Sequence, residues 1–225
     1  RQIEEQLYQK ELEKANLEQR FSFAQLQLIK SQLNPHFLFN TLNMVARTAQ
    51  LEEAPMTEEM LIALSNLLRY SLRTSEPFAP LDQELKVVED YMYLQKMRFG
   101  DRIDWKISCD VENVQVYVPV FLIQPLVENA VLHGISSKEE GGSINVEVRG
   151  TDERLEISVA DTGVGMDEEK LQRIRQAIGQ RESGLGIGMG NIYRRISAYY
   201  TYGEVQVDSK EGEGTVVRII FGGRK

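Results

Sequence analysis

The stretch RLEISVADTGVGM, residues 154–166, contains the features that decide the fold of the second half of this chain. The run RLEISVAD is rich in β-forming residues and predicts a strand that ends at Asp161. Two glycines, Gly163 and Gly165, follow directly. A carboxylate at a strand end, beside glycines that admit close backbone approach, suits recognition of an exocyclic amine such as that of adenine. Taken alone, the same glycines are explained equally well by a simple loop.

Further β-rich and helical runs alternate around this strand. The other β-rich runs are IDWKIS, SINVEVRG, GEVQVDS and TVVRIIF, and the helical runs are VFLIQPLVENAVLH, DEEKLQRIRQAI and GNIYRRISAYY. Short turns such as EEGG at 139–142 separate these strands and helices, and hairpin-like turns join several of the strands. This order predicts an α+β domain over residues 101–225, in which a mixed sheet carries helices on one face.

The first 100 residues have a helical texture instead. Residues 1–33 contain no glycine or proline, and several apolar positions follow a 3.5-residue stripe that Lys10 and Lys14 interrupt; the stripe consists of Ile3, Leu7, Leu17, Phe21, Ala24 and Leu28. This spacing predicts a coiled-coil-like seam, with a plain amphipathic helix as the alternative. We therefore assign residues 1–100 to a helical dimerisation region.

Two more helices are predicted within this region. One covers Thr57 to Arg73, with Thr57 as its N-cap and acidic residues in its first turn. The stretch EPFAP then interrupts the pattern, and a helix follows from Leu81 to about Phe99, where an FGD turn ends it.

Bulk composition narrows the class of protein. The 225 residues carry a formal net charge of -8 and a pI near 5.0, which argues against a nucleic-acid binder because such proteins need clustered Lys and Arg. The single cysteine, Cys109, cannot form an internal disulfide and fits a reducing, cytoplasmic compartment. No window is apolar enough to span a bilayer. The sequence starts without methionine, so we expect a cytoplasmic fragment whose membrane segment lies upstream.

The stretch SQLNPHFLFN, residues 31–40, places one of only two histidines directly after a proline within a helical pattern. Pro35 removes a backbone donor and should kink the helix. Helical spacing puts His36, Asn40, Asn43 and Arg47 on one polar face. Neutral imidazole is a good nucleophile near pH 7, so His36 is either a phosphoryl acceptor or a packing residue.

Two further features suggest a bound nucleotide. SGLGIGMGN at 183–191 contains four alternating glycines and opens a helix, so its backbone N–H groups can face an anion, although it matches neither a Walker A loop nor Rossmann spacing. In the helical run 120–133, Glu128 and Asn129 interrupt an apolar surface, which is costly unless they have polar partners. A Mg²⁺ ion that bridges nucleotide phosphates is one such partner.

The order NPHFLFNTLN, QPLVENAVLHG, DTGVGM, GIGMGN and GEGT resembles the sensor histidine kinases of the LytS/YesM type from residue 30 to the C-terminus. The resemblance implies a Bergerat ATP-binding fold, autophosphorylation from Mg-ATP, a homodimer, and relay of the phosphoryl group to an aspartate of a response-regulator receiver domain. It also implies the site residues: His36 as phosphoacceptor, Asn129 as Mg²⁺ ligand, Asp161 on the adenine amine with Gly163 and Gly165 beside the base, Gly186, Gly188 and Gly190 in the lid over the phosphates, and Thr215 as support of the adenine site through water.

Two positions depart from related patterns. Leu132 stands where many related kinases carry a lysine, which puts one phosphate contact in doubt. Pro125 stands where the ATPase branch of the fold carries its water-activating glutamate, and proline cannot accept a proton.

These departures leave two alternatives to a kinase. One is a Bergerat-fold ATPase, and the other is a catalytically idle scaffold that binds nucleotide. The general base for His36 is not identified by the sequence, with Glu128 and Asn40 as candidates. For His133, at the end of the same helical run, we favour a structural role.

Overall fold

The structure is a computed structural model and describes residues 35–72, 77–151, 153–180 and 189–224. The chain divides into two compact units, residues 1–65 and residues 66–225. The predicted seam over residues 3–28 lies outside the described residues, as do the residues that precede Pro35. No described helix has the length and apolar character needed to cross a membrane.

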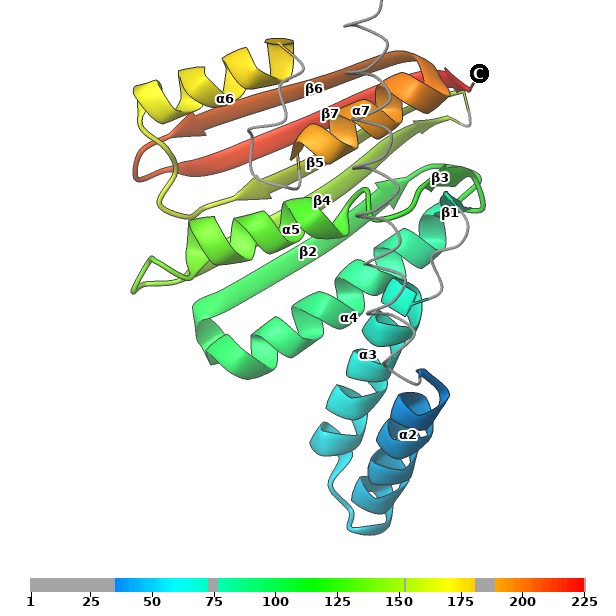
Figure 1. Cartoon of the computed structure of the whole chain (residues 1–225). Helices are drawn as coiled ribbons and strands as arrows, with labels where there is room; N and C mark the ends of the chain where they lie inside the picture. The colour runs from blue at the N-terminus through cyan, green and yellow to red at the C-terminus, as the bar shows by residue number, and fades with distance from the viewer. Residues whose placement is uncertain (1–34, 73–76, 152, 181–188, 225) are drawn as a thin grey trace, which may run out of the picture. The chain divides into compact units, whose positions relative to one another are not determined.

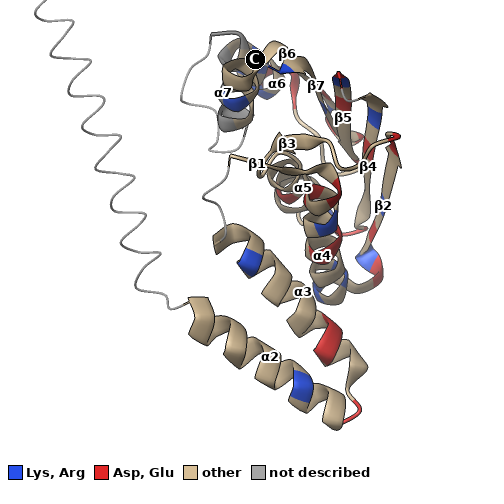
Figure 2. Cartoon of the chain, turned by 90° about the vertical axis from the view of Figure 1, so that its right-hand side faces the viewer, with Lys and Arg blue, Asp and Glu red and all other residues tan. Residues whose placement is uncertain are grey.

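Two helices joined by a tight turn form the described part of the first unit. Helix α2 covers Pro35–Leu51, and α3 covers Pro55–Leu72, so that α3 continues into the second unit. The helix expected from Thr57 is confirmed, but Thr57 is not its cap. The helix starts two residues earlier because proline is favoured in the first turn, where a backbone N–H has no partner to lose. Charged residues are few along α2 and α3 (Figure 2).

A five-stranded mixed sheet is the frame of the second unit (Figure 1). Its order is β2-β4-β5-β7-β6, in which β2 and β4 are parallel and every other pair is antiparallel. The strands are β2 (Ile103–Asp110), β4 (Gly142–Thr151), β5 (Arg154–Asp161), β6 (Tyr200–Lys210) and β7 (Gly214–Arg224). All five coincide with β-rich runs of the sequence, so the predicted mixed sheet is confirmed.

Helices cover one face of this sheet, as expected. Helix α4 (Leu81–Phe99), α5 (Gln124–Asn129) and α7 (Met189–Tyr199) lie on the same face (Figures 1 and 2), and α6 (Glu168–Gln180) lies beside β6. Apolar side chains of these helices and of the sheet form one core; its fully buried members include Leu81, Leu122, Ile123, Ile144, Leu155, Ile157, Ile196, Ile219 and Phe221. Burial of this apolar surface is the main favourable contribution to folding of the domain.

The helical run predicted over residues 120–133 is only partly right. Residues 120–123 form a turn, α5 then spans six residues, and a π-helix, η2 (Ala130–Ile135), continues it. The wider winding is visible where the Ser136 N–H donates to the Val131 carbonyl, 2.8 Å away and five residues back. A residue inserted into a helix in this way is common at functional sites.

The sequence also hides a second, small sheet. The interruption EPFAP contains strand β1 (Phe78–Pro80), which pairs antiparallel with β3 (Tyr117–Pro119). Both strands have three residues and both end in proline, which is why neither resembles a strand in isolation.

The two edges of the main sheet are partly covered by cationic side chains. At the β6 edge, the Arg175 Nε of α6 donates to the Val207 carbonyl at 3.0 Å. At the β2 edge, the Lys96 Nζ of α4 donates to the Ile103 carbonyl at 2.9 Å, and exposed Asp104, Lys106 and Asp110 follow along the strand.

Candidate functional site

Asp161 is the last residue of β5 and the one polar member of its buried face. Leu155, Ile157, Val159 and Asp161 alternate along the strand and all point to the helix-covered side. Asp161 is 9 % exposed, and its Oδ1 accepts the Gly163 N–H at 2.8 Å. Burial raises the pKa of the Asp161 carboxyl, while the backbone N–H groups of Gly163 and Thr215 and the charge of Lys138 act in the opposite direction. The carboxylate is therefore a sheltered acceptor at the end of the sheet.

Glycines let the backbone close around this carboxylate. A Cβ on Gly134, in η2, would lie 2.6 Å from Asp161 Oδ1, and a Cβ on Gly163 would lie 2.3 Å from the carbonyl carbon of Gly134. Gly165 has φ +65°, and a Cβ there would meet the Lys210 carbonyl oxygen at 1.9 Å. The close approach of three backbone segments thus requires glycine at positions 163 and 165.

The helix that carries Asn129 ends against the same loop. Asn129 is the last residue of α5, and five residues later the Gly134 carbonyl accepts the Val164 N–H at 3.1 Å. Within the described residues the Asn129 side chain, half-buried, forms no hydrogen bond. Its amide is therefore available to another partner. Leu132, three residues further along, is 60 % exposed and offers no charge.

Thr215 lies directly beside Asp161 in the sheet. It pairs with Asp161 on one side and with Ser209 of β6 on the other, so the three side chains form a polar row across three strands. The Ser209 and Thr215 hydroxyl oxygens are 2.9 Å apart, and the Met166 N–H donates to Ser209 Oγ at 2.9 Å. This row connects the loop of residues 162–166 to the end of β6 and the start of β7.

Glu128 faces a different environment from Asn129. Its Oε1 accepts the Gln124 Nε2 hydrogen bond at 2.8 Å, one turn earlier in α5. On α4, burial and the nearby negative charge of Glu128 raise the pKa of Tyr91 to about 12. As a candidate base for His36, Glu128 stays a prediction.

His36 belongs to the other unit and occupies the second position of α2. Its ring is exposed, and the Asn40 Nδ2 lies 3.3 Å from Nδ1 and 3.4 Å from Nε2. The two distances are nearly equal, so the Asn40 amide contacts the ring without selecting one nitrogen. His36, Asn40 and Arg47 are all exposed, which fits the polar helix face expected from the sequence.

The remaining predicted residues lie in or next to the segment after α6. Gly186 and Gly188 lie outside the described residues, and Gly190 is the second residue of α7. On the same helix, the guanidinium of Arg195 donates to the Val120 carbonyl, so this arginine is engaged by the protein itself.

Sequence reasoning did not assign roles to Gly134, Ser209 and Lys138. The Lys138 Nζ donates to the Thr162 carbonyl at 2.8 Å and thereby holds the loop after Asp161. The role of Gly134 could have been predicted from the sequence, because a glycine directly after His133 suggests a helix end with close backbone approach. Ser209 and Lys138 carry no such signal, because their roles depend on strand register and chain reversal.

Two protein families match successive parts of the chain. The family described as histidine kinase matches residues 24–103, and the family described as histidine kinase-, DNA gyrase B-, and HSP90-like ATPase matches residues 119–223.

Individual proteins of known type are also similar. The chain is 35% identical over 182 residues to the sensor histidine kinase YpdA of Escherichia coli (strain K12), a match that covers 80% of this chain and 31% of that protein. It is 31% identical over 204 residues to the sensor protein kinase HptS of Staphylococcus aureus (strain USA300), with 89% and 38% covered. The chain thus spans 31% to 38% of the length of these relatives. One similar solved structure is the histidine kinase domain of the blue-light activated histidine kinase from Erythrobacter litoralis EL346. Its sequence is 18% identical to this chain and the TM-score is 0.46. The match covers 88% of this chain and 91% of that chain.

Proposed function

Because the chain belongs to the sensor histidine kinases, with a histidine kinase domain followed by an ATPase-like domain, we propose that it transfers the γ-phosphoryl group of Mg-ATP to His36. The observation that carries the proposal is the exposed imidazole of His36 on α2, inside the stretch matched by the histidine kinase family. An exposed neutral imidazole has a free lone pair near pH 7 and needs no strong activation to attack phosphorus.

The residues around Asp161 fit an adenine nucleotide. Within the described residues the nearly buried Asp161 carboxylate accepts backbone N–H groups but has no cationic partner at hydrogen-bond distance, and the exocyclic amine of adenine would be a further donor to it. Gly163 and Gly165 let the loop after Asp161 pack against the backbone of Gly134 and Lys210, which holds this loop beside the carboxylate where the base would bind. The hydroxyl of Thr215 belongs to the same polar row as Asp161 and in this proposal supports the base through water.

Asn129 suits a magnesium ion bound with the nucleotide phosphates. Its half-buried amide has no hydrogen bond within the described residues, and Mg²⁺ takes oxygen ligands, few of them from the protein. The ion neutralises the charge that develops on the phosphates during transfer. Gly186, Gly188 and Gly190 complete the proposal as the lid over the phosphates.

Pro125 supports phosphoryl transfer over hydrolysis. It lies one turn before Asn129 on α5, where a carboxylate would be needed to activate water. Without that base, the phosphoryl group passes to a nucleophile that the protein supplies, which is His36 in this proposal.

We further propose that the chain works as a homodimer and passes its phosphoryl group to an aspartate of a response-regulator receiver domain. Support for the dimer comes from α2 and from the first part of α3, where large apolar side chains are exposed: Phe37, Met44, Val45, Leu51, Met56, Met60, Ile62 and Leu64. Such a surface is stabilised by burial against a second copy. As in the sensor kinases that it resembles, we place the chain on the cytoplasmic side of a membrane-anchored protein.

The test is incubation of the chain with γ-labelled Mg-ATP, followed by mapping of acid-labile phosphate and measurement of free phosphate. The kinase proposal expects label on His36 and none in the His36→Gln variant, whose affinity for ATP is unchanged. Free phosphate in large excess that persists in His36→Gln would assign the site to an ATPase. Nucleotide binding without any label would assign it to an idle scaffold.

A further inference from the structure

Glu84 is a buried carboxylate that lies outside the proposed nucleotide contacts. It sits in the first turn of α4, is 1 % exposed, and accepts four hydrogen bonds. Its Oε1 accepts from the Tyr70 hydroxyl and from the Phe121 N–H at 2.8 Å; its Oε2 accepts from the Leu122 N–H at 2.9 Å and the Ile123 N–H at 3.2 Å. Burial raises the pKa of the Glu84 carboxyl, and the four donors act in the opposite direction. A carboxylate so deeply buried persists only where each oxygen is satisfied.

The three backbone donors belong to one turn, residues 120–123, which is held from several sides. Phe121 has φ +55°, a conformation that is unfavourable for a bulky residue and persists only where the surroundings impose it. The Val120 N–H donates to the Pro77 carbonyl at 3.1 Å, and the Val120 carbonyl accepts from Arg195. Without Glu84, three neighbouring N–H groups in this turn would lose their acceptor.

This turn leads directly into the helix that carries Asn129. Residues 121–123 precede Gln124, the first residue of α5, and the Ile123 carbonyl accepts the N–H groups of Leu126 and Val127 at 3.0 and 3.2 Å. The carboxylate of Glu84 therefore satisfies the N–H group of Ile123, the N-cap of α5, together with those of the two residues before it, and its negative charge is favourable at a helix start. Asn129 follows six residues after Ile123 on the same short, rigid segment.

Tyr70 connects Glu84 to the last turn of α3. Its hydroxyl donates to the carboxylate, and its ring packs edge-on against Phe121 with centroids 5.1 Å apart. Tyr70 is itself buried. One side chain of α3 thus fixes both the carboxylate and the strained residue of the turn.

We propose that Glu84 is a positioning residue for the Asn129 helix, and that Tyr70 orients Glu84 from α3. Neither side chain touches the nucleotide. Together they fix the start of the helical segment that carries the Asn129 amide, which would be a ligand of Mg²⁺. This inference rests on the proposed function, because it takes Asn129 as the magnesium ligand.

The substitution Glu84→Gln tests the inference with little change of volume. Both oxygens of Glu84 accept a backbone N–H, so a glutamine NH₂ group faces an N–H donor in either orientation. The readout is the magnesium-dependent gain in ATP affinity, measured as the ratio of the Kd in EDTA to the Kd in Mg²⁺. All variants are built on the full chain carrying His36→Gln, so that no transfer consumes ATP. We expect the ratio to fall about 10-fold, the scale of a lost charged hydrogen bond.

Three further variants make the outcome decisive. Asn66→Ala breaks the 2.9 Å hydrogen bond to Asp90 between the same helices, α3 and α4, without contacting residues 120–123, and should leave the ratio unchanged. Tyr70→Phe, which removes one hydroxyl and leaves the ring, should lower the ratio about 3-fold. Asn129→Ala should lower the ratio by itself, and adding Glu84→Gln to it should lower the ratio no further.

If Glu84 has only a structural role, Glu84→Gln weakens ATP binding equally with and without Mg²⁺. An unchanged ratio of the two Kd values in Glu84→Gln therefore overturns the inference. If Glu84→Gln does not fold, an unchanged ratio in Tyr70→Phe overturns it instead. If Asn129→Ala leaves the ratio unchanged, the proposed magnesium role of Asn129 fails, and this failure is distinct from the other two.

Discussion

The helices of residues 35–65 and the sheet domain of residues 66–225 use apolar side chains in opposite ways. Eight of the eleven large apolar side chains that are exposed among the described residues lie on α2 and the first part of α3, whereas only Ala46, Ala49 and Ala63 are buried there. In the sheet domain nearly every large apolar residue enters the core, and Leu132 is an exception. The sheet domain therefore has the core of an independent folding unit, and the helices carry an exposed apolar surface, which is the surface of the proposed dimer.

This difference separates two tasks. The helices carry the proposed phosphoacceptor and the proposed dimer contacts, and the sheet domain carries the proposed nucleotide site. Substitutions in one region should therefore spare the task of the other, and the following predictions run from the largest expected effect to the smallest.

Asn129→Ala should lower phosphorylation of His36 by about 100-fold or more, because a magnesium ligand acts directly on the transferring phosphoryl group. Self-association should be unchanged, since Asn129 lies in the sheet domain. Quantification of acid-labile phosphate, together with sedimentation at several concentrations, checks both parts. A variant that lost its dimer as well as its label would show that the two regions are not separable in this way.

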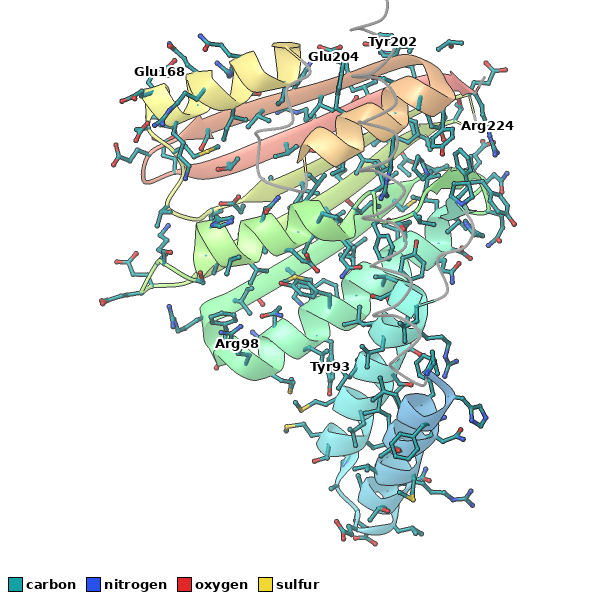
Figure 3. All side chains as sticks on the ribbon, in the orientation of Figure 1. Tyr93, Arg98, Glu168, Tyr202, Glu204 and Arg224 are labelled. Carbon is teal, nitrogen blue, oxygen red and sulfur yellow. The ribbon has the colours of Figure 1, made fainter. Side chains whose placement is uncertain are left out.

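Met44→Glu combined with Ile62→Glu should weaken self-association by about 100-fold, because two exposed apolar side chains become charges that burial would have to desolvate. ATP affinity should stay unchanged. Sedimentation equilibrium measures the first effect and calorimetry the second. The matched control is Tyr202→Glu: Tyr202 is exposed on β6 of the sheet domain, near Glu204 (Figure 3), and should leave the oligomeric state as it is.

Asp161→Ala should weaken binding of adenine nucleotides by about 1 to 3 kcal/mol, the cost of leaving the adenine amine without an acceptor. The unmodified chain should bind GTP poorly, since guanine presents a carbonyl oxygen where Asp161 needs a donor. Competition between ATP and GTP in a binding assay checks the second statement. Equal affinities would remove Asp161 from base recognition.

The smallest effect is a pH dependence of stability. Burial raises the pKa of the Asp161 carboxyl in the folded chain. At pH values between the ordinary pKa of about 4 and this raised pKa, the carboxyl is protonated in the folded chain and ionised in the unfolded chain. The stability of the unmodified chain relative to Asp161→Asn should therefore fall as pH rises through this window and stay constant above it. Urea unfolding at several pH values measures this difference. Asp110→Asn, at an exposed position of β2, is the control; if it gave the same curve, Asp161 would not be the cause.

Much of the fold is predictable because local pattern and final structure agree. The strand of residues 154–161 and the helix of residues 81–99 have the composition, length and end signals of their elements, and tertiary packing changes neither. The π-helix is different, since its extra residue is stabilised by contacts of Gly134 with Asp161 and Val164, which come from a distant part of the chain. Strands β1 and β3 exist through mutual pairing, which no local signal reports.

The residues of the candidate site also differ in whether the sequence alone makes them recognisable. Asp161, Gly163 and Asn129 are visible in the sequence because a carboxylate, a glycine or an amide in an apolar run needs an explanation. Glu84 is not, because an acidic residue in the first turn of a helix is ordinary, and its burial against residues 121–123 depends on a chain reversal.

The cationic side chains at the sheet edges bear on how far self-association can proceed. An uncovered edge strand is a template for strand addition from another molecule, and repeated addition produces open polymers. Here Arg175 occupies a carbonyl of β6, and Lys96 with the charged residues of β2 makes the opposite edge unfavourable for a neighbouring strand. Strand addition is thereby disfavoured at both edges, and the proposed dimer through the helices, built on a twofold axis, would be a closed assembly that stops growing at two copies.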